Sequence, residues 1–235
     1  AGGDVVSTIK KGIIDPSLMP DTHTFMIAMM SALLAAALWL NLATYVGAPV
    51  STTHSVVGGV MGAGIAATGM NAVNWGTMGK IAASWVISPA MGGIIAIAFL
   101  VFIKFAIYYQ TDMIKAARRW VPVLVAIMAT AFSVYLVMKG LKKIWKAEPM
   151  EIGMIAMATF VISYAPVRPA VAKASKNLEN RRKAVSTLFT IPLICSAALL
   201  SFAHGANDVA NAIGPLAAIV SSASTGAVYA KVGVP

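Results

Sequence analysis

The strongest constraint on this chain is a long run without any formally charged side chain. Thr22 to Val46 contains no Asp, Glu, Lys or Arg. At a rise of about 1.5 Å per residue, a helix of this length crosses the roughly 30 Å hydrocarbon core of a bilayer. Further uncharged stretches occupy residues 81–103, 120–138, 152–167 and 185–203. The sequence therefore predicts an all-α polytopic membrane protein with about five spanning helices.

The composition excludes an ordinary soluble domain. Hydrophobic residues make up 59% of the chain and charged residues 11%, against about 45–50% and 25% in soluble proteins. The net charge is +10, but the basic residues lie in short runs between apolar stretches rather than on one soluble face. We therefore expect membrane lipid as a partner, no nucleic acid, and a multi-pass location in the cell (plasma) membrane.

The distribution of basic residues predicts the topology. The segments 104–119 and 168–183 lie on one side of the predicted spans and carry ten Lys and Arg residues. The opposing loops carry five lysines, which are Lys80, Lys139, Lys142, Lys143 and Lys146. Because basic residues favour the cytoplasmic side, we expect residues 168–184 to form a basic cytoplasmic loop.

Two apolar segments do not have the pattern of plain spanning helices. Residues 47–69 are rich in Gly, Ser and Thr, and residues 205–226 contain an Asp, two Asn and a Gly-Pro step. We expect two broken or re-entrant elements here. Irregular backbone is tolerated in a membrane only where it lines a cavity or is buried in protein.

Asp208 is the one acidic residue inside an apolar region; the other seven fall in predicted loops or at span ends. A carboxylate at mid-membrane costs about 2.5–3.5 kcal/mol, so a neighbouring group must compensate it. Asn207 and Asn211 flank Asp208, and Gly205 and the Gly-Pro step would free backbone groups nearby. Carboxylate and amide oxygens suit a small cation, and freed amides suit an anion. Alternatively, Asp208 caps a helix near the interface.

The second polar cluster is Ser51, Thr52 and Thr53, which follow Pro49. Proline is favoured as the first residue of a helix, which would leave the amides near Ser51 unpaired at the positive end of the helix dipole. Amides and hydroxyls together can replace the water of a tetrahedral oxyanion. In the alternative interpretation these hydroxyls hold transmembrane helices together.

Two histidines adjoin the polar clusters. His54 follows the threonines and His204 precedes Gly205, so either side chain could contact an anion or carry a proton near neutral pH. A packing or hydrogen-bonding role is the alternative. The three histidines of the chain have no metal-ligand spacing. We expect no cofactor, and if the site takes a metal ion, we expect it at Asp208.

Both clusters match known motifs. The P-V-S-T-T-H string of residues 49–54 and the G-A-N-D-V-A-N-A-I-G-P string of residues 205–215 resemble the inorganic phosphate transporter (PiT) family of sodium or proton symporters. The resemblance covers essentially the whole chain and implies an inverted-repeat transporter fold. Each repeat would supply one string of each kind, so we expect the partner strings to precede Ala1 and to follow Pro235.

The resemblance also implies roles for the parts of the chain. Residues 1–167 would be the remainder of the first repeat with connecting spans, and residues 185–235 the start of the second. The implied phosphate ligands are Ser51, Thr52, Thr53, Asn207 and Asn211. The implied cation-coupling residues are Asp208 and Asn207, with sodium held by Asp208 if the coupling ion is sodium. A homodimer is a further implication.

The expected function is secondary active transport of inorganic phosphate by sodium or proton symport with alternating access. The partners would be inorganic phosphate and the coupling cation, and the protein would not be an enzyme. Three alternatives stay open: transport of a related oxyanion such as sulfate, an ion channel, and an intramembrane hydrolase. The hydrolase lacks a paired-carboxylate site, and broken helices around one acid fit an occluded site better than an open pore.

Overall fold

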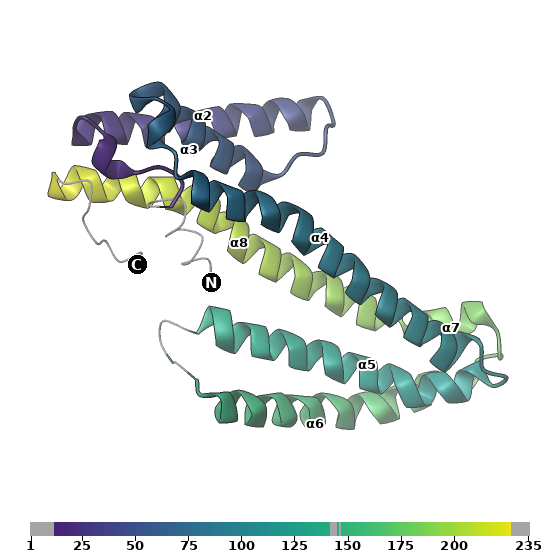
Figure 1. Ribbon diagram of the computed structural model, residues 1–235. Helices are drawn as coiled ribbons and strands as arrows, with labels where there is room; N and C mark the ends of the chain where they lie inside the picture. The colour runs from purple at the N-terminus through teal and green to yellow at the C-terminus, as the bar shows by residue number, and fades with distance from the viewer. Residues whose placement is uncertain (1–11, 142–144, 146, 227–235) are drawn as a thin grey trace. The chain divides into compact units, whose positions relative to one another are not determined.

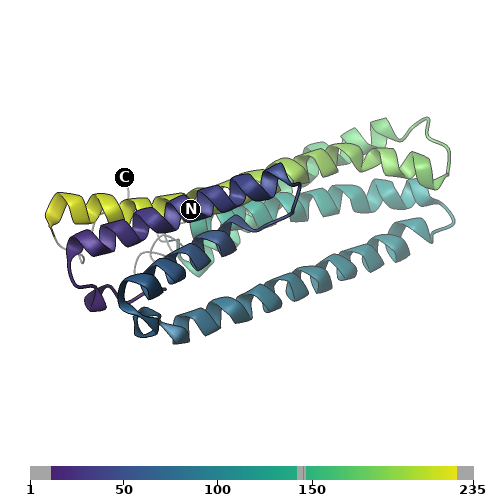
Figure 2. The same ribbon diagram turned by 90° about the horizontal axis from the view of Figure 1, so that it is seen from above.

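The computed structural model describes residues 12–141, 145 and 147–226, which are almost entirely helical (Figures 1 and 2). The α-helices are α2 (Thr22–Tyr45), α3 (Thr52–Thr68), α4 (Trp75–Ile103), α5 (Met113–Tyr135), α6 (Pro149–Ala174), α7 (Arg182–Leu188) and α8 (Thr190–Thr225). The short helices are η1 (Pro16–Leu18), η2 (Met70–Ala72) and the π-helical turns η3 (Lys104–Tyr108) and η4 (Leu136–Gly140). Within the described ranges, extended pairing is limited to the bridge between Ile14 and Val73.

Within the described residues, five helical segments are long and apolar enough to cross a membrane, in agreement with the predicted number of spans. They cover Thr22–Tyr45, Trp75–Tyr108, Met113–Gly140, Pro149–Ala174 and Thr190–Thr225. The prediction of a helical, multi-pass membrane protein is therefore correct. Lys142, Lys143 and Lys146, which entered the topology prediction, lie outside the described residues, as do the outer ends of the ranges 1–167 and 185–235.

The structure corrects the expected break between residues 205 and 226. Helix α8 is continuous for 36 residues and passes through Gly205 and Pro215. A glycine inside a helix costs only about 1 kcal/mol relative to alanine, and free backbone groups are more costly than that in lipid. Pro215 removes one hydrogen bond, the one that would end on the carbonyl of Asn211. Of the backbone groups that we expected to be freed, Pro215 frees the carbonyl of Asn211.

The basic segment 168–184 is shorter as a loop than expected. Helix α6 continues to Ala174 and α7 begins at Arg182, so that residues 175–181 connect them. Helix α4 likewise begins at Trp75, ahead of the expected residue 81, because a single lysine near a span end can extend its charge toward water.

Polar caps explain where several helices begin. The Asp21 carboxylate accepts the Thr24 amide at 2.6 Å, which starts α2 and holds the pKa of Asp21 below its ordinary value. Asp112 caps α5 in the same way by accepting the Lys115 amide at 2.8 Å. Helix α6 starts with a reciprocal capping box between Glu148 and Glu151.

The chain forms two compact units, each with its own core. One unit comprises the described residues of 2–87 and 204–235, and the other comprises residues 88–203. Helices α4 and α8 each contribute to both units. This grouping follows packing, and the division into 1–167, 168–184 and 185–235 stays a prediction.

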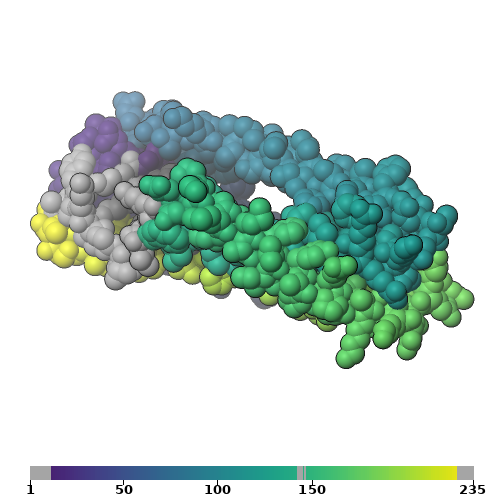
Figure 3. All heavy atoms as spheres, turned by 90° about the horizontal axis from the view of Figure 1, so that it is seen from below, coloured from purple at the N-terminus to yellow at the C-terminus, as the bar shows by residue number. Residues whose placement is uncertain are grey.

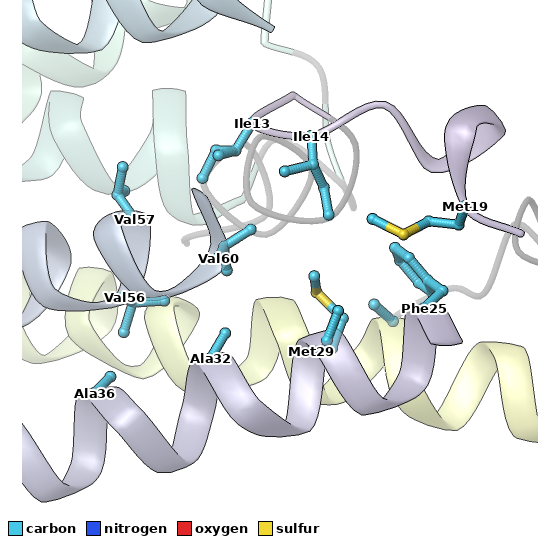
Figure 4. Packing of buried hydrophobic residues seen from close by; sticks show 12 residues of the cluster. Ile13, Ile14, Met19, Phe25, Met29, Ala32, Ala36, Val56, Val57 and Val60 are labelled. Atoms are coloured by element: carbon cyan, nitrogen blue, oxygen red, sulfur yellow. The ribbon is translucent and has the colours of Figure 1, made fainter. Parts of the chain in front are cut away.

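Small side chains let α2 and α3 pack closely in the first unit. In Figure 4, Val56 and Val60 of α3 lie beside Ala32 and Ala36 of α2, and all four are buried. A Cβ atom added to Gly59 would lie 2.8 Å from the carbonyl oxygen of Ala32. Such close backbone approach is typical of membrane helices, whose association depends on packing.

In the second unit, α5 and α6 pack side by side around Ala117, Val121 and Val171 (Figure 1). Arg118 of α5 donates from Nε to the Ser175 hydroxyl at 2.6 Å and from Nη2 to the Ser175 carbonyl at 3.0 Å. These bonds attach α5 to the connection between α6 and α7.

Candidate functional site

The first turn of α3 presents amides and hydroxyls. Ser51 is its N-cap and accepts the His54 amide at 3.3 Å, and the Ser55 amide makes the first helical bond, to the Ser51 carbonyl, at 3.0 Å. Pro49, expected as the first helical residue, therefore lies two residues before the cap. The amides of Thr52 and Thr53 have no carbonyl one turn earlier in the helix to bond. This end of α3 carries the positive end of the helix dipole.

Asp208 lies on α8 with two polar neighbours. Its Oδ2 is 3.2 Å from Nε2 of His204, and its Oδ1 accepts the side-chain amide of Asn211 at 3.4 Å. The Asp208 side chain is 31% exposed, whereas His204 is 74% exposed. These contacts supply part of the compensation that the sequence required for this carboxylate.

A hydrogen bond joins the two clusters. Nδ2 of Asn211 donates to Oγ1 of Thr53 at 2.9 Å. Asn211 is 1% exposed, so this bond is shielded from solvent. The structure thus brings Thr53 and Asp208 to the same side-chain nitrogen, Nδ2 of Asn211.

Within the part of the chain that the structure describes, Asn211 also has an acceptor oxygen on its side chain without a partner and a backbone carbonyl without its usual donor. Its buried Oδ1 has no hydrogen-bond partner among the described residues. Its backbone carbonyl lacks the usual helical donor because that donor would be the missing N–H of Pro215. A buried acceptor without a partner costs about 1–3 kcal/mol. Beside a carboxylate, such oxygens are suitable ligands for a small hard cation.

The structure does not bring every expected residue into this cluster. Asn207 is exposed, and its side chain has no hydrogen-bond partner in the described part of the chain. The hydroxyl oxygen of Ser51 already accepts the His54 amide as the helix cap. The side chain of Thr52 is half-buried and forms no hydrogen bond with the described residues. Their assignment as phosphate ligands stays a prediction.

Two contacts were missed at the sequence level. His54 lies against Trp85 of α4, with ring centroids 4.0 Å apart. No local pattern indicates this contact, because Trp85 is 31 positions away and resembles an interfacial anchor. The His204 contact with Asp208 was detectable, since residues four apart share a helix face, but the expected break at Gly205 concealed it.

The described residues contain no cluster of three or more His, Cys, Asp or Glu side chains that could hold a metal ion. The described residues therefore do not form a transition-metal centre built from His, Cys, Asp or Glu side chains. The oxygen groups around Asn211 have a different chemistry and would suit an alkali cation.

These features define a multi-pass helical membrane protein in which the start of one helix meets an acidic, amide-bearing segment of another. The chain belongs to the phosphate transporter family, whose family model matches residues 1–235. It is 54% identical over 224 residues to a protein named "Putative phosphate permease" of Helicobacter pylori (strain J99), covering 93% of this chain and 41% of that protein. A relative of the same description in Pyrococcus abyssi is 36% identical, with 100% of this chain and 57% of that protein covered.

A solved structure described as "The sodium-dependent phosphate transporter" has the same fold. It matches with a TM-score of 0.90 and 36% identity, over 98% of this chain and 56% of that chain. The chain thus spans about half the length of the relatives that it matches. Their names describe permeases and transporters, in agreement with the expectation that this is not an enzyme.

Proposed function

We propose that the protein carrying this chain transports inorganic phosphate across the membrane by symport with a cation. The observation that carries the proposal is the 2.9 Å hydrogen bond from Asn211 to Thr53, which joins an anion-suited helix start to an acidic segment. The family membership of the chain supports phosphate as the anion. The similarity to a protein described as sodium-dependent favours sodium as the cation.

The anion would bind at the first turn of α3. The amides of Thr52 and Thr53 are free of helical bonds at this end, and Ser51, Thr52 and Thr53 each add a hydroxyl to the same turn. Donors of this kind bind phosphate without a fixed positive charge. Asn207, which is exposed on α8, is available as a further donor.

The cation would bind beside Asp208. The Asp208 carboxylate supplies the charge, and the unpartnered Oδ1 of Asn211 supplies a neutral oxygen. This assignment changes the role of Asn211 relative to the sequence-based expectation. Its donor nitrogen is already engaged with Thr53, so its free atom suits a cation better than a phosphate oxygen.

The shared amide of Asn211 gives a physical route for coupling. A cation held by Oδ1 would fix the orientation of the amide group and so direct Nδ2 toward Thr53. Thr53 would then be held in place when phosphate arrives, so each ligand would favour the binding of the other. We further propose that the ions cross by alternating access between inverted repeats, as the sequence motifs imply.

The test is uptake of radiolabelled phosphate by proteoliposomes that contain the full-length protein, with sodium and pH gradients imposed independently. Accumulation of phosphate above the external concentration, driven by the sodium gradient alone, is the expected result. Uptake driven only by the pH gradient would show that the coupling ion is the proton and not sodium. Uptake of sulfate in preference to phosphate would contradict the proposed substrate, and flux without accumulation would indicate a channel.

A further inference from the structure

A long apolar groove lies in the unit formed by residues 88–203, and the transport site does not use it. Its volume is about 600 Å³, within the range of about 300–1,000 Å³ typical of ligand pockets. Its walls come from α5, α6 and the segment from α7 into α8, and they include Val125, Val167, Ala170, Ala174, Leu188 and Cys195.

The length of the groove matches one leaflet of a bilayer. Lining residues on α6 extend from Ser163 to Ala174, which is about 17 Å at 1.5 Å per residue. Half of a hydrocarbon core of roughly 30 Å is about 15 Å. Both α5 and α6 lie in candidate membrane spans, so the groove is suited to a hydrocarbon chain rather than to a water-soluble molecule.

One end of the groove is positively charged. Arg118 is held at this end by two hydrogen bonds to Ser175, the residue that follows the lining residue Ala174. Both acceptors are neutral, and among the described residues Arg118 forms no ion pair, so its positive charge remains available to a ligand. The exposed side chains of Lys173, Arg182 and Lys183 come from the same end of α6 and the start of α7.

Basic residues outnumber acidic ones in the segments at this end, where Asp112 and Glu179 are the acidic residues of 112–119 and 173–183. Glu179 pairs with Arg181 at 2.8 Å, and Asp112 accepts the amide at the start of α5. In Figure 3 the surface of α6 is green, and long side chains project from its lighter end, where the connection to α7 lies. The end of the groove therefore combines an apolar channel with a cationic rim.

We propose that this groove binds an anionic phospholipid, with an acyl chain along α6 and the phosphate against Arg118, Lys173, Arg182 and Lys183. The charge complementarity selects an anionic headgroup, and the topology prediction places this end at the cytoplasmic leaflet, which carries the anionic lipids. Lysine and arginine stems can also cover the upper part of the acyl chain while their charges reach the phosphate.

Native mass spectrometry of the purified full-length protein tests this site. The protein is incubated with phosphatidylglycerol or with phosphatidylcholine of identical acyl chains, and the bound lipid is measured. We expect phosphatidylglycerol to be retained several-fold better. Lys173→Gln should reduce its retention about fivefold, and the triple change K173Q/R182Q/K183Q by about tenfold or more, with phosphatidylcholine unaffected.

Groove-filling variants test the acyl-chain part separately. Ala170→Trp, and independently Cys195→Phe from the α8 wall, should lower retention of both lipids. Lys80→Gln and Ala158→Trp are matched controls, because neither residue lines the groove, and both should behave as wild type. Melting temperatures without added lipid identify a variant that fails to fold.

Two results would overturn the proposal. Equal retention of the two lipids would show that the basic side chains do not select the headgroup. Unchanged phosphatidylglycerol retention in both folded filling variants would show that another occupant, such as a further protein segment or a second copy, covers the groove.

Discussion

Asn211 of α8 donates its side-chain amide to Thr53 of α3 at 2.9 Å, across 158 positions of the sequence. The same nitrogen lies 3.4 Å from the Asp208 carboxylate, and the oxygen of the same amide is buried without a partner. One side chain therefore contacts a hydroxyl at a helix start, faces a carboxylate and offers a free acceptor. Asn211 therefore links the position of Thr53 at the start of α3 to that of Asp208 on α8.

Replacing Thr53 tests this link. Thr53→Val keeps the shape of the side chain but removes the acceptor for Asn211, while Thr53→Ser keeps the hydroxyl. A hydrogen bond of this kind contributes about 1 kcal/mol, and a donor left unsatisfied costs somewhat more. In full-length protein we expect the valine variant to weaken the apparent affinity for phosphate by about fivefold to tenfold, with serine restoring most of it.

Concentration dependence distinguishes this result from a general loss of folding. Uptake is measured against phosphate and against sodium at matched amounts of protein in the membrane. Because Asn211 is shared, the valine variant should also weaken the apparent affinity for sodium. A serine variant as impaired as the valine variant would show that the hydroxyl bond is not the relevant interaction.

Asp208→Asn removes the carboxylate charge beside the proposed cation position and keeps the size of the side chain. We expect cation-driven phosphate uptake to fall to background, while insertion is unharmed, because a neutral amide is less costly in hydrocarbon than a carboxylate. Glu179→Gln is the matched control, since its exposed ion pair contributes little. Wild-type cation dependence in Asp208→Asn would make Asp208 a structural residue.

The number and approximate place of the spans could be predicted because a charge in hydrocarbon is costly, and uncharged runs of about 20 residues are therefore diagnostic. The continuity of α8 could not be predicted in this way. Gly205 and Pro215 are helix breakers in water, but a membrane raises the cost of leaving backbone groups unpaired. Local sequence rules derived from soluble helices therefore placed a break where the structure has none.

The candidate site was predictable in its parts but not in its contacts. Asp208 was conspicuous because it is an isolated acid in an apolar region, and the sequence placed Thr53 and Asn211 in two polar clusters. Which atoms meet depends on how α3 packs near α8, and no local pattern encodes the bond between them. The contact of His54 with Trp85 is hidden for the same reason.

Trp85 is expected to position His54 next to the first turn of α3. Trp85→Ala removes the ring that lies 4.0 Å from the imidazole, and Trp85→Phe keeps an aromatic face. A ring contact contributes about 0.5–1.5 kcal/mol, so the alanine variant should raise the apparent KM for phosphate by about twofold to tenfold. The maximal rate should change little.

The control for this measurement is Trp39→Ala, which removes an exposed tryptophan from α2. It should leave the KM unchanged. If Trp85→Phe raises the KM as much as Trp85→Ala, the aromatic contact with His54 is not what matters.

The connection between α6 and α7 is expected to face the cytoplasm. Asn177 is exposed in this connection, so a cysteine there is accessible to reagents, and Cys195→Ala removes the native thiol. In intact cells we expect Asn177→Cys to be labelled by a membrane-permeant maleimide and protected from an impermeant one. Rapid labelling by the impermeant reagent would reverse the topology that the basic residues predict.

The packing of α2 on α3 depends on a glycine that cannot be enlarged. A Cβ at position 59 would lie 2.8 Å from the backbone oxygen of Ala32, whereas a Cβ at Gly62, one turn further along α3, meets nothing within 4 Å. Gly59→Ala must therefore separate the helices, at a cost of about 1–3 kcal/mol. Gly62→Ala should be neutral or stabilising, because alanine restricts the unfolded chain and favours the helix.

Thermal unfolding of the two variants in detergent compares these effects directly. We expect the melting temperature to fall by several degrees for Gly59→Ala and to stay level or rise for Gly62→Ala. Because Thr53 lies at the start of the same helix, displacement of α3 should also weaken the apparent affinity for phosphate in the Gly59 variant. Equal melting temperatures for the two variants would contradict the close approach of α3 to α2 at Gly59 and Ala32.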